Sequence, residues 1–300
     1  MNTESGELLI EGWYRQYKPL LAAIAYRMLG SKSEAEDAVQ DVFVTLSKQD
    51  PVQIDHPKAY LIKLVTNRAL NMMKAAPRNR ESYPGLWLPE PLLATDDGPQ
   101  DHVLRQEQLG YAMLVLLQTC TPPERAVFVL RDSLGCDYAE IAGMLGKTEA
   151  ACRKIYSRAA AKIGLRSGSA EENEWDQAMD RFVQSFADAV TTGRFDAFIR
   201  LLTQDAVLLS DGGGIVRAAL RPILGPERIA AFFTGIARKG SLTGKLRPVR
   251  MSGQPGLLLE REGRLPMVLT LEPTPDGAGI RALYLVSNPH KLGDFAADLL

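Results

Sequence analysis

Two basic stretches and one acidic helix face contain the residues of this sequence best suited to chemistry. Residues 58–80 hold six Lys or Arg and no Asp or Glu, and residues 147–166 hold six against Glu149 alone. Grouped cations neutralise nucleic-acid phosphates, so both stretches are candidate DNA-contacting surfaces. A helix predicted over 33–48 gathers the other polar groups on one face: Glu36, Asp37, Gln40 and Asp41. An acidic docking face combined with two basic segments predicts a protein that bridges another protein to DNA.

The sequence offers little material for a metal centre. Its three cysteines (Cys120, Cys136 and Cys152) have no CxxC spacing, and its three histidines (His56, His102 and His290) are scattered. Buried free thiols are therefore expected, in place of a disulfide framework or a zinc site. We expect no metal and no cofactor.

The C-terminal part offers three carboxylates as candidates for acid–base catalysis, namely Asp205, Asp211 and Glu260. Asp211 precedes three glycines, which is typical of a tight hairpin turn in which Asp bonds its own backbone and Gly supplies positive φ. We therefore interpret this motif as a turn, expect no catalytic residue, and predict that the protein is not an enzyme.

Length and composition predict an ordinary globular protein. A chain of 300 residues with 46% hydrophobic side chains is expected to form two or three domains. It has no apolar run long enough to span a membrane, and its polar N-terminus has no signal-peptide core. A cytoplasmic location is expected.

The acidic helix and the first basic stretch fall in a predicted all-α domain over residues 8–80. Its helices are expected over 14–29, 33–48 and 57–74, the second opened by a capping box of Ser33 with Glu36. Residues 81–100 hold four prolines and two glycines, so they are predicted to form a linker without helix. The linker is nevertheless apolar enough to pack on another part of the chain, through Trp87, Leu88, Leu92 and Leu93.

Residues 101–166 form the second predicted all-α domain. Capping boxes at Thr121–Glu124 and Asp137–Glu140 open two helices, and Gly146 separates the second from a helix over 148–163. A short helix, a glycine turn and a helix with a basic outer face follow the helix-turn-helix plan, whose second helix enters the major groove. The side chains expected to face DNA are Lys147, Arg153, Lys154, Ser157, Arg158 and Lys162.

Residues 174–300 form a predicted α+β domain. Two helices come first, and a third is expected over 226–238. Strands are expected over 206–210, 215–220, 245–251, 256–261, 265–272 and 279–286. The last four strands are expected to form an antiparallel sheet, and the order of elements matches a cone-shaped α+β plan that commonly encloses a pocket.

Three runs in the helical domains resemble the extracytoplasmic-function sigma factors of bacterial RNA polymerase: residues 35–43 (AEDAVQDVF), 59–71 (AYLIKLVTNRALN) and 121–128 (TPPERAVF). Residues 83–91 (YPGLWLPEP), 211–214 (DGGG) and 288–292 (NPHKL) look like the signatures of the SigJ-type subgroup, which carries a C-terminal SnoaL-like (NTF2-like) domain. The chain departs from the usual pattern in four places, the first being residues 76–80 (APRNR), which are less basic than this stretch often is. Ile215 replaces a lysine, His290 replaces an aspartate, and Asn71 sits where an aspartate is common.

The resemblance implies roles for both helical domains. The acidic helix would meet the β′ clamp of the polymerase through Asp37, Gln40, Asp41 and Phe43. The −10 element would be recognised and melted by Lys63, Asn67, Arg68, Lys74, Arg78 and Arg80, with Asn67 near the pocket for a flipped-out base. The helix-turn-helix would read the −35 element.

The implied partners are core RNA polymerase, through its β′ clamp and β flap, and promoter DNA, with no membrane partner. The C-terminal pocket could hold an unknown small ligand. Two alternatives stay open: a one-component helix-turn-helix repressor with a ligand-sensing NTF2-like domain, and a SnoaL-like enzyme fused to a DNA-binding module. The acidic helix and the −10-type segment favour the sigma factor, because a repressor needs neither.

The resemblance further implies that the fused domain regulates the two DNA-binding domains from within the chain. We expect Trp87 and Leu88 of the linker to pack near Asp211, Gly212, Gly213 and Gly214. Asn288 and Pro289 are expected to close over this contact.

Overall fold

The computed structural model describes residues 2–48, 51–75, 83–93, 110–163, 172–252, 254–274, 276–293 and 295. The chain forms two compact units. The first comprises Met1–Glu81, Thr95–Leu109 and Met113–Leu165, and the second comprises Ser82–Ala94, Gly110–Ala112 and Arg166–Leu300. The start of the predicted linker therefore belongs with the C-terminal domain.

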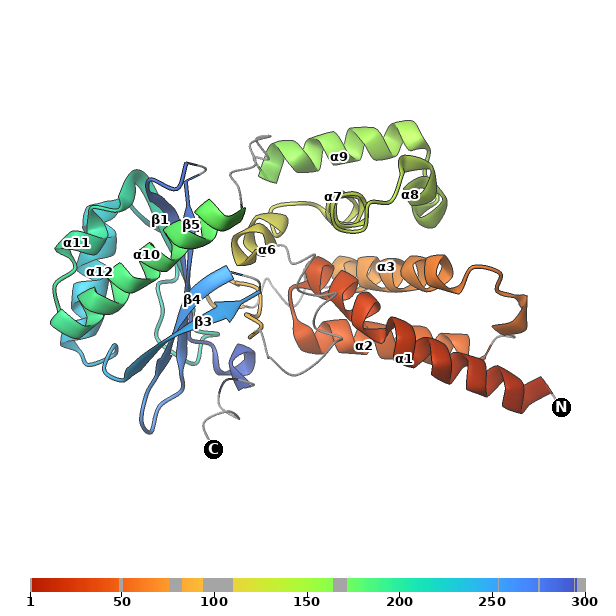
Figure 1. The fold of residues 1–300 in the computed structure, drawn as a ribbon, viewed down its shortest axis with the longest axis horizontal. Coiled ribbons are helices and arrows are strands. Elements are labelled where there is room, and N and C mark those ends of the chain that lie inside the picture. Colours follow the sequence, from red (N-terminus) through yellow and green to blue (C-terminus); the bar gives the residue numbers. More distant parts are fainter. Residues whose placement is uncertain are drawn as a thin grey trace. The chain divides into compact units, whose positions relative to one another are not determined.

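The first unit begins with α1 (Asn2–Leu29), α2 (Lys32–Leu46), the 3-10 turn η1 (Pro51–Gln53) and α3 (Pro57–Ala75) (Figure 1). Helix α2 buries the apolar face that its sequence predicted, from Ala35 to Leu46. The capping box predicted at Ser33 is wrong. Ser31 is the cap, and its hydroxyl accepts from the Glu34 amide at 3.5 Å. The same Ser-x-x-Glu spacing occurs two residues earlier, so the pattern alone had two solutions.

The helix-turn-helix part of the first unit follows the sequence closely. It contains α6 (Tyr111–Leu117), apart from Tyr111 and Ala112, which belong to the second unit, together with α7 (Pro122–Phe128), the π-helical turn η2 (Val129–Ser133), α8 (Tyr138–Leu145) and α9 (Glu149–Ile163). Both predicted capping boxes are confirmed. Gly146 ends α8 in the left-handed conformation (φ 62°), which glycine adopts without steric strain because it has no Cβ. Phe128 stacks on Tyr156 across the core of this part, with ring centroids 5.9 Å apart.

The second unit is a mixed sheet with helices on one face (Figure 1). Its helices are α10 (Glu172–Thr192), α11 (Asp196–Ile199) and α12 (Pro226–Arg238), and a 3-10 turn, η3 (Pro289–Lys291), follows the sheet. The strands are β1 (Leu202–Asp211), β2 (Ile223–Leu224), β3 (Lys245–Met251), β4 (Gln254–Glu260), β5 (Met267–Pro273) and β6 (Ile280–Val286). The strand order is β2-β1-β6-β5-β4-β3, and β1 runs parallel to β6 while the other pairs are antiparallel.

Phenylalanines fill the space between the sheet and the helices. Phe186 lies 4.9 Å from Phe198 and 5.0 Å from Phe233 between ring centroids, and Phe195 stacks on Phe233 at 5.7 Å. Helices α10, α11 and α12 therefore contribute phenylalanines to the core of this unit.

The strand predicted over 215–220 is wrong. The amides of Ile215 and Val216 both donate to the Gly212 carbonyl, at 3.1 and 2.9 Å, and close an irregular turn. Only Ile223–Leu224 pairs with β1 in this region. The turn places Asp211, at the end of β1, opposite Val286 at the end of β6.

Candidate functional site

The acidic face predicted to bind polymerase lies on α2. Asp37 and Gln40 are exposed, and Asp41 is partly exposed. Phe43 is only 8% exposed and packs edge-on against Tyr14, with ring centroids 5.0 Å apart. Phe43 therefore belongs to the core that holds α2, and the three polar residues supply its accessible face.

An ion pair joins the predicted polymerase face to the predicted −10 helix. The Arg68 guanidinium on α3 meets the Asp41 carboxylate through Nε at 2.7 Å and Nη2 at 2.6 Å. Both side chains are nearly half exposed, so solvent screening keeps the stabilisation small. Asp41 nevertheless fixes where the Arg68 charge sits.

Three other predicted −10 residues also lie on α3. Lys63 and Lys74 are exposed, whereas Asn67 is partly buried. The Asn67 side-chain amide donates to the Met144 carbonyl of α8 at 3.4 Å. The amide assigned to a flipped-out base thus contacts the helix-turn-helix in this structure. Arg78 and Arg80 lie outside the described residues.

Helix α9 presents the predicted −35 residues on one exposed face. Among the described residues, Lys154, Ser157 and Arg158 have no side-chain partner. Arg153 is held by Glu149 at 2.8 Å and lies over the Tyr138 ring at 5.2 Å. Lys147 is exposed in the turn just before α9.

Lys162 has a structural contact that the sequence did not reveal. Its Nζ lies 2.6 Å from the Glu124 carboxylate, which also accepts from the Thr121 amide at 2.8 Å. Burial opposes ionisation of Glu124, but these hydrogen bonds hold the pKa of its carboxyl below the ordinary value. Lys162 therefore secures the start of α7.

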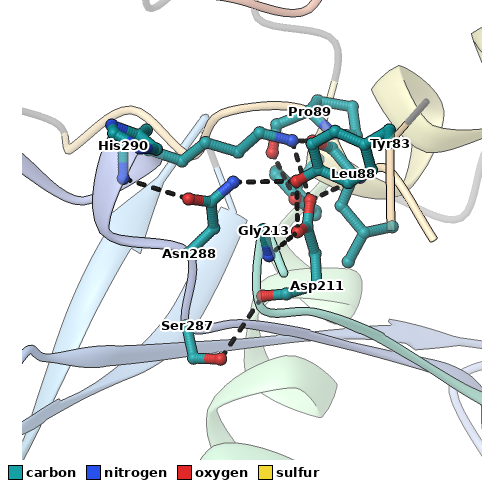
Figure 2. A network of polar contacts seen from close by, with 10 residues as sticks. Tyr83, Leu88, Pro89, Asp211, Gly213, Ser287, Asn288 and His290 are labelled. Atoms are coloured by element: carbon teal, nitrogen blue, oxygen red, sulfur yellow. Dashed lines mark hydrogen bonds and ion pairs between the residues drawn. The ribbon is translucent and has the colours of Figure 1, made fainter. Parts of the chain in front are cut away.

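In the second unit, the Asp211 carboxylate is the centre of a buried polar network (Figure 2). One oxygen accepts from the Tyr83 hydroxyl at 2.6 Å and from the Gly213 amide at 2.9 Å. The other accepts from the Leu88 amide at 2.9 Å and from Lys291 Nζ at 2.7 Å. Four donors thus converge on one carboxylate, two of them from the linker.

Lys291 and Asn288 complete this network from the segment after β6. Lys291 also donates to the Leu88 carbonyl, and its Nζ lies 4.1 Å from the centroid of the Trp87 ring. Asn288 donates to the Tyr83 hydroxyl at 2.8 Å and accepts from the His290 amide at 3.0 Å. Burial, together with the Asp211 charge, raises the pKa of Tyr83 well above its usual value. In this structure the linker therefore contacts Asp211, Asn288 and Lys291.

The three glycines allow this close approach. A Cβ on Gly213 would lie 2.5 Å from the Asn288 side chain, and one on Gly214 would lie 2.3 Å from Pro84. Both glycines have positive φ, and the Gly213 amide bonds the Asp211 side chain as expected of such a turn. The linker therefore packs directly on this turn.

Sequence reasoning missed Tyr83 and Lys291 as members of this site. Both lie inside motifs that were singled out, at the start of 83–91 and within 288–292. In the structure, the buried pair of Lys291 and Asp211 marks the site clearly. The sequence alone did not show which acid Lys291 faces. The two departures from the usual motif, Ile215 and His290, have exposed side chains outside the Asp211 contacts.

A second group of contacts holds the rest of the linker. The Tyr111 hydroxyl donates to the Pro89 carbonyl at 2.7 Å, and its ring lies 5.8 Å from that of Tyr284. The Ala112 amide donates to Gln254 at 3.3 Å, and Leu93 pairs with Met251 in a β-bridge. Residues 110–112 are thus anchored beside residues 83–93.

The other two carboxylates considered for catalysis lie apart from Asp211 in their contacts. Asp205 is exposed, and Glu260 pairs with Arg247 at 3.0 Å. No group of three metal-ligating side chains occurs among the described residues. In the described part of the chain, no helix has the length and apolar content needed to cross a membrane.

Comparison with known proteins agrees with this arrangement. Residues 13–79 match the Sigma-70 region 2 family and residues 112–163 match Sigma-70, region 4. The ECF RNA polymerase sigma factor SigJ of Mycobacterium tuberculosis is 33% identical over 73% of this chain and 70% of its own length. The probable ECF RNA polymerase sigma factor SigI of the same organism is 27% identical over 95% of this chain and 96% of its own.

The crystal structure of Mycobacterium tuberculosis SigJ is similar over both units. It matches with a TM-score of 0.76 and 26% identity, covering 94% of this chain and 97% of the other. The helical domains, the helix-turn-helix and the C-terminal mixed sheet thus recur together in one family. This chain belongs to the extracytoplasmic-function sigma factors, which direct RNA polymerase to promoters.

Proposed function

We propose that this sigma factor docks on core polymerase through α2, reads the −10 element through α3 and reads the −35 element through α9. The observation that carries this proposal is the separation of charge between helices of one unit. Asp37, Gln40 and Asp41 give α2 an acidic face, whereas α3 and α9 expose cations. The polymerase that it serves is in the cytoplasm.

The −35 assignment rests on the exposed face of α9. Arg153→Ala combined with Arg158→Ala is expected to weaken binding to a −35 duplex by roughly 1–3 kcal/mol per base-contacting arginine. Fluorescence anisotropy with the isolated −35 duplex measures this loss. Exchanging Arg194 and Arg200 for alanine is the matched control, because both are exposed in the second unit. Equal affinities of the α9 variant and the wild type would contradict the assignment.

The −10 assignment rests on the Asn67 amide. Asn67→Ala is expected to reduce promoter melting several-fold while leaving −35 binding unchanged, because the base pocket loses a hydrogen-bonding group. Permanganate reactivity of the −10 thymines reports the melting. Asn71→Ala, four residues on and exposed, is the control. An unchanged permanganate signal for folded Asn67→Ala would remove this role.

We further propose that the second unit is a regulatory domain and has no enzymatic role. Asp211, the most buried of its candidate carboxylates, already accepts four hydrogen bonds within the chain and has no open position for a substrate. The unit's core is packed with phenylalanines, which favours a holding role over ligand sensing. Through Asp211 and Lys291 it would hold the linker and thereby influence where the two DNA-binding parts are placed.

A further inference from the structure

One end of the second unit carries a group of basic side chains that form no ion pair with a carboxylate of the described residues. Residues 238–264 hold seven Lys or Arg against two Asp or Glu. Five of these bases form no ion pair with any described residue: Arg238, Lys239, Lys245, Arg261 and Arg264. The two acids do not offset them, because Glu260 is paired with Arg247 and Glu262 is exposed without an ion pair. We call these five residues the basic end.

The basic end is built from two segments that are fastened together. Arg261 Nη1 and Arg264 Nη1 donate to the carbonyls of Ser241 and Gly240, each at 3.4 Å. In the backbone register of the β3–β4 ladder, Lys245 lies opposite Glu260, which directly precedes Arg261. The α12–β3 connection and the β4–β5 turn therefore present their cations side by side.

The two arginines are held in place by backbone groups. Arg261 donates from Nε to the Leu265 carbonyl at 2.7 Å, and its Nη2 contacts the same oxygen. Burial lowers the pKa of the Arg261 guanidinium, and the nearby Arg264 charge lowers it further. The fold thus keeps two like charges close together without an ion pair to any described carboxylate, an arrangement that a polyanion would relieve.

We propose that the basic end binds the phosphate backbone of duplex DNA, as a contact additional to those of α3 and α9. The segments 238–245 and 260–265 contain no aromatic, Asn or Gln side chain that could stack on or read a base. Cations that contact only phosphates position a duplex without reading its sequence. The inference rests on the proposed function only in taking DNA as the partner.

The test uses the full chain and a duplex of about 30 base pairs without promoter elements, with binding measured by anisotropy over a salt series. Arg261→Gln combined with Arg264→Gln is expected to lower affinity several-fold at low salt. It should also reduce the slope of log K against log salt by about 1–2, since each phosphate contact contributes about 0.9. Arg194→Gln combined with Arg200→Gln, an exposed pair in the same unit, should leave the slope unchanged.

A second pair keeps the test valid if the first variant fails to fold. Lys239→Gln with Lys245→Gln removes two cations whose side chains form no hydrogen bond among the described residues, and the same loss of slope is expected. An unchanged slope in a folded pair overturns the proposal. Lost binding to core polymerase with an unchanged slope also overturns it, and assigns the basic end to an acidic protein surface. The −35 duplex assay with Arg153 and Arg158 tests the proposed function separately.

Discussion

Asp211→Asn is expected to release the linker from the second unit. The variant removes one partner of an ion pair in which Asp211 is fully buried and Lys291 is 9% exposed. Breaking such a pair typically costs about 3–5 kcal/mol, because the remaining charge stays buried without compensation. An asparagine also has only one acceptor oxygen, so it cannot accept from all four donors that Asp211 now binds. The Leu88 amide, which donates to Asp211, reports the release directly.

Hydrogen exchange at Leu88 measures this effect. A loss of 3 kcal/mol corresponds to exchange faster by about 100-fold. Asp205→Asn, an exposed change on the same strand, should leave the exchange unchanged. Adding Lys291→Met to Asp211→Asn should restore part of the protection, because it removes the unpaired charge. Full protection of Leu88 in folded Asp211→Asn would show that the carboxylate does not hold the linker.

Reversal of Asp37 and Asp41 to lysine is expected to abolish binding to core polymerase without unfolding the protein. Like charges brought together at an interface cost several kcal/mol by order of magnitude, whereas an exposed helix face tolerates the exchange. A native gel with core enzyme measures holoenzyme formation. Glu227→Lys, an exposed reversal on α12, serves as the control for net charge.

The effects of Asp37→Lys and Asp41→Lys should be measured separately, because Asp41 also forms an ion pair with Arg68. Asp37→Lys alone changes the docking face and leaves the Arg68 contact in place. Holoenzyme formed at wild-type levels by the folded double variant would refute the docking role of α2.

Much of the helical architecture could be predicted because local signals determine it. The glycine after α1, the proline and the box that open α7, and the box and Gly146 around α8 act within one helical turn. The apolar spacing of α2 likewise set its buried face, Phe43 included. Phe43 was also assigned to the polymerase face, on the basis of the family motif at residues 35–43. The apolar spacing of α2, in contrast, already predicted that Phe43 is buried.

The remaining features depend on contacts between distant residues. The linker joins Asp211 across more than 100 residues, and no local pattern shows that Tyr83, Leu88 and Lys291 meet one carboxylate. The strand expected over 215–220 had apolar residues but no neighbour to pair with, because Gly212 closes the turn. Ser31 and Ser33 have the same spacing to a following glutamate, and the structure has Ser31 as the cap.

Leu93 and Ala112, on either side of residues 94–109, are both held by one hairpin of the second unit. Leu93 pairs with Met251 at the end of β3, and Ala112 bonds Gln254 at the start of β4. A cut in the peptide chain between these points would therefore leave both new ends bound to the same pair of strands. The protein could then be supplied as two polypeptides divided in this stretch, which the sheet would bring back together. The same place would accept an inserted domain, since its flanking residues are held whether or not the chain between them is continuous.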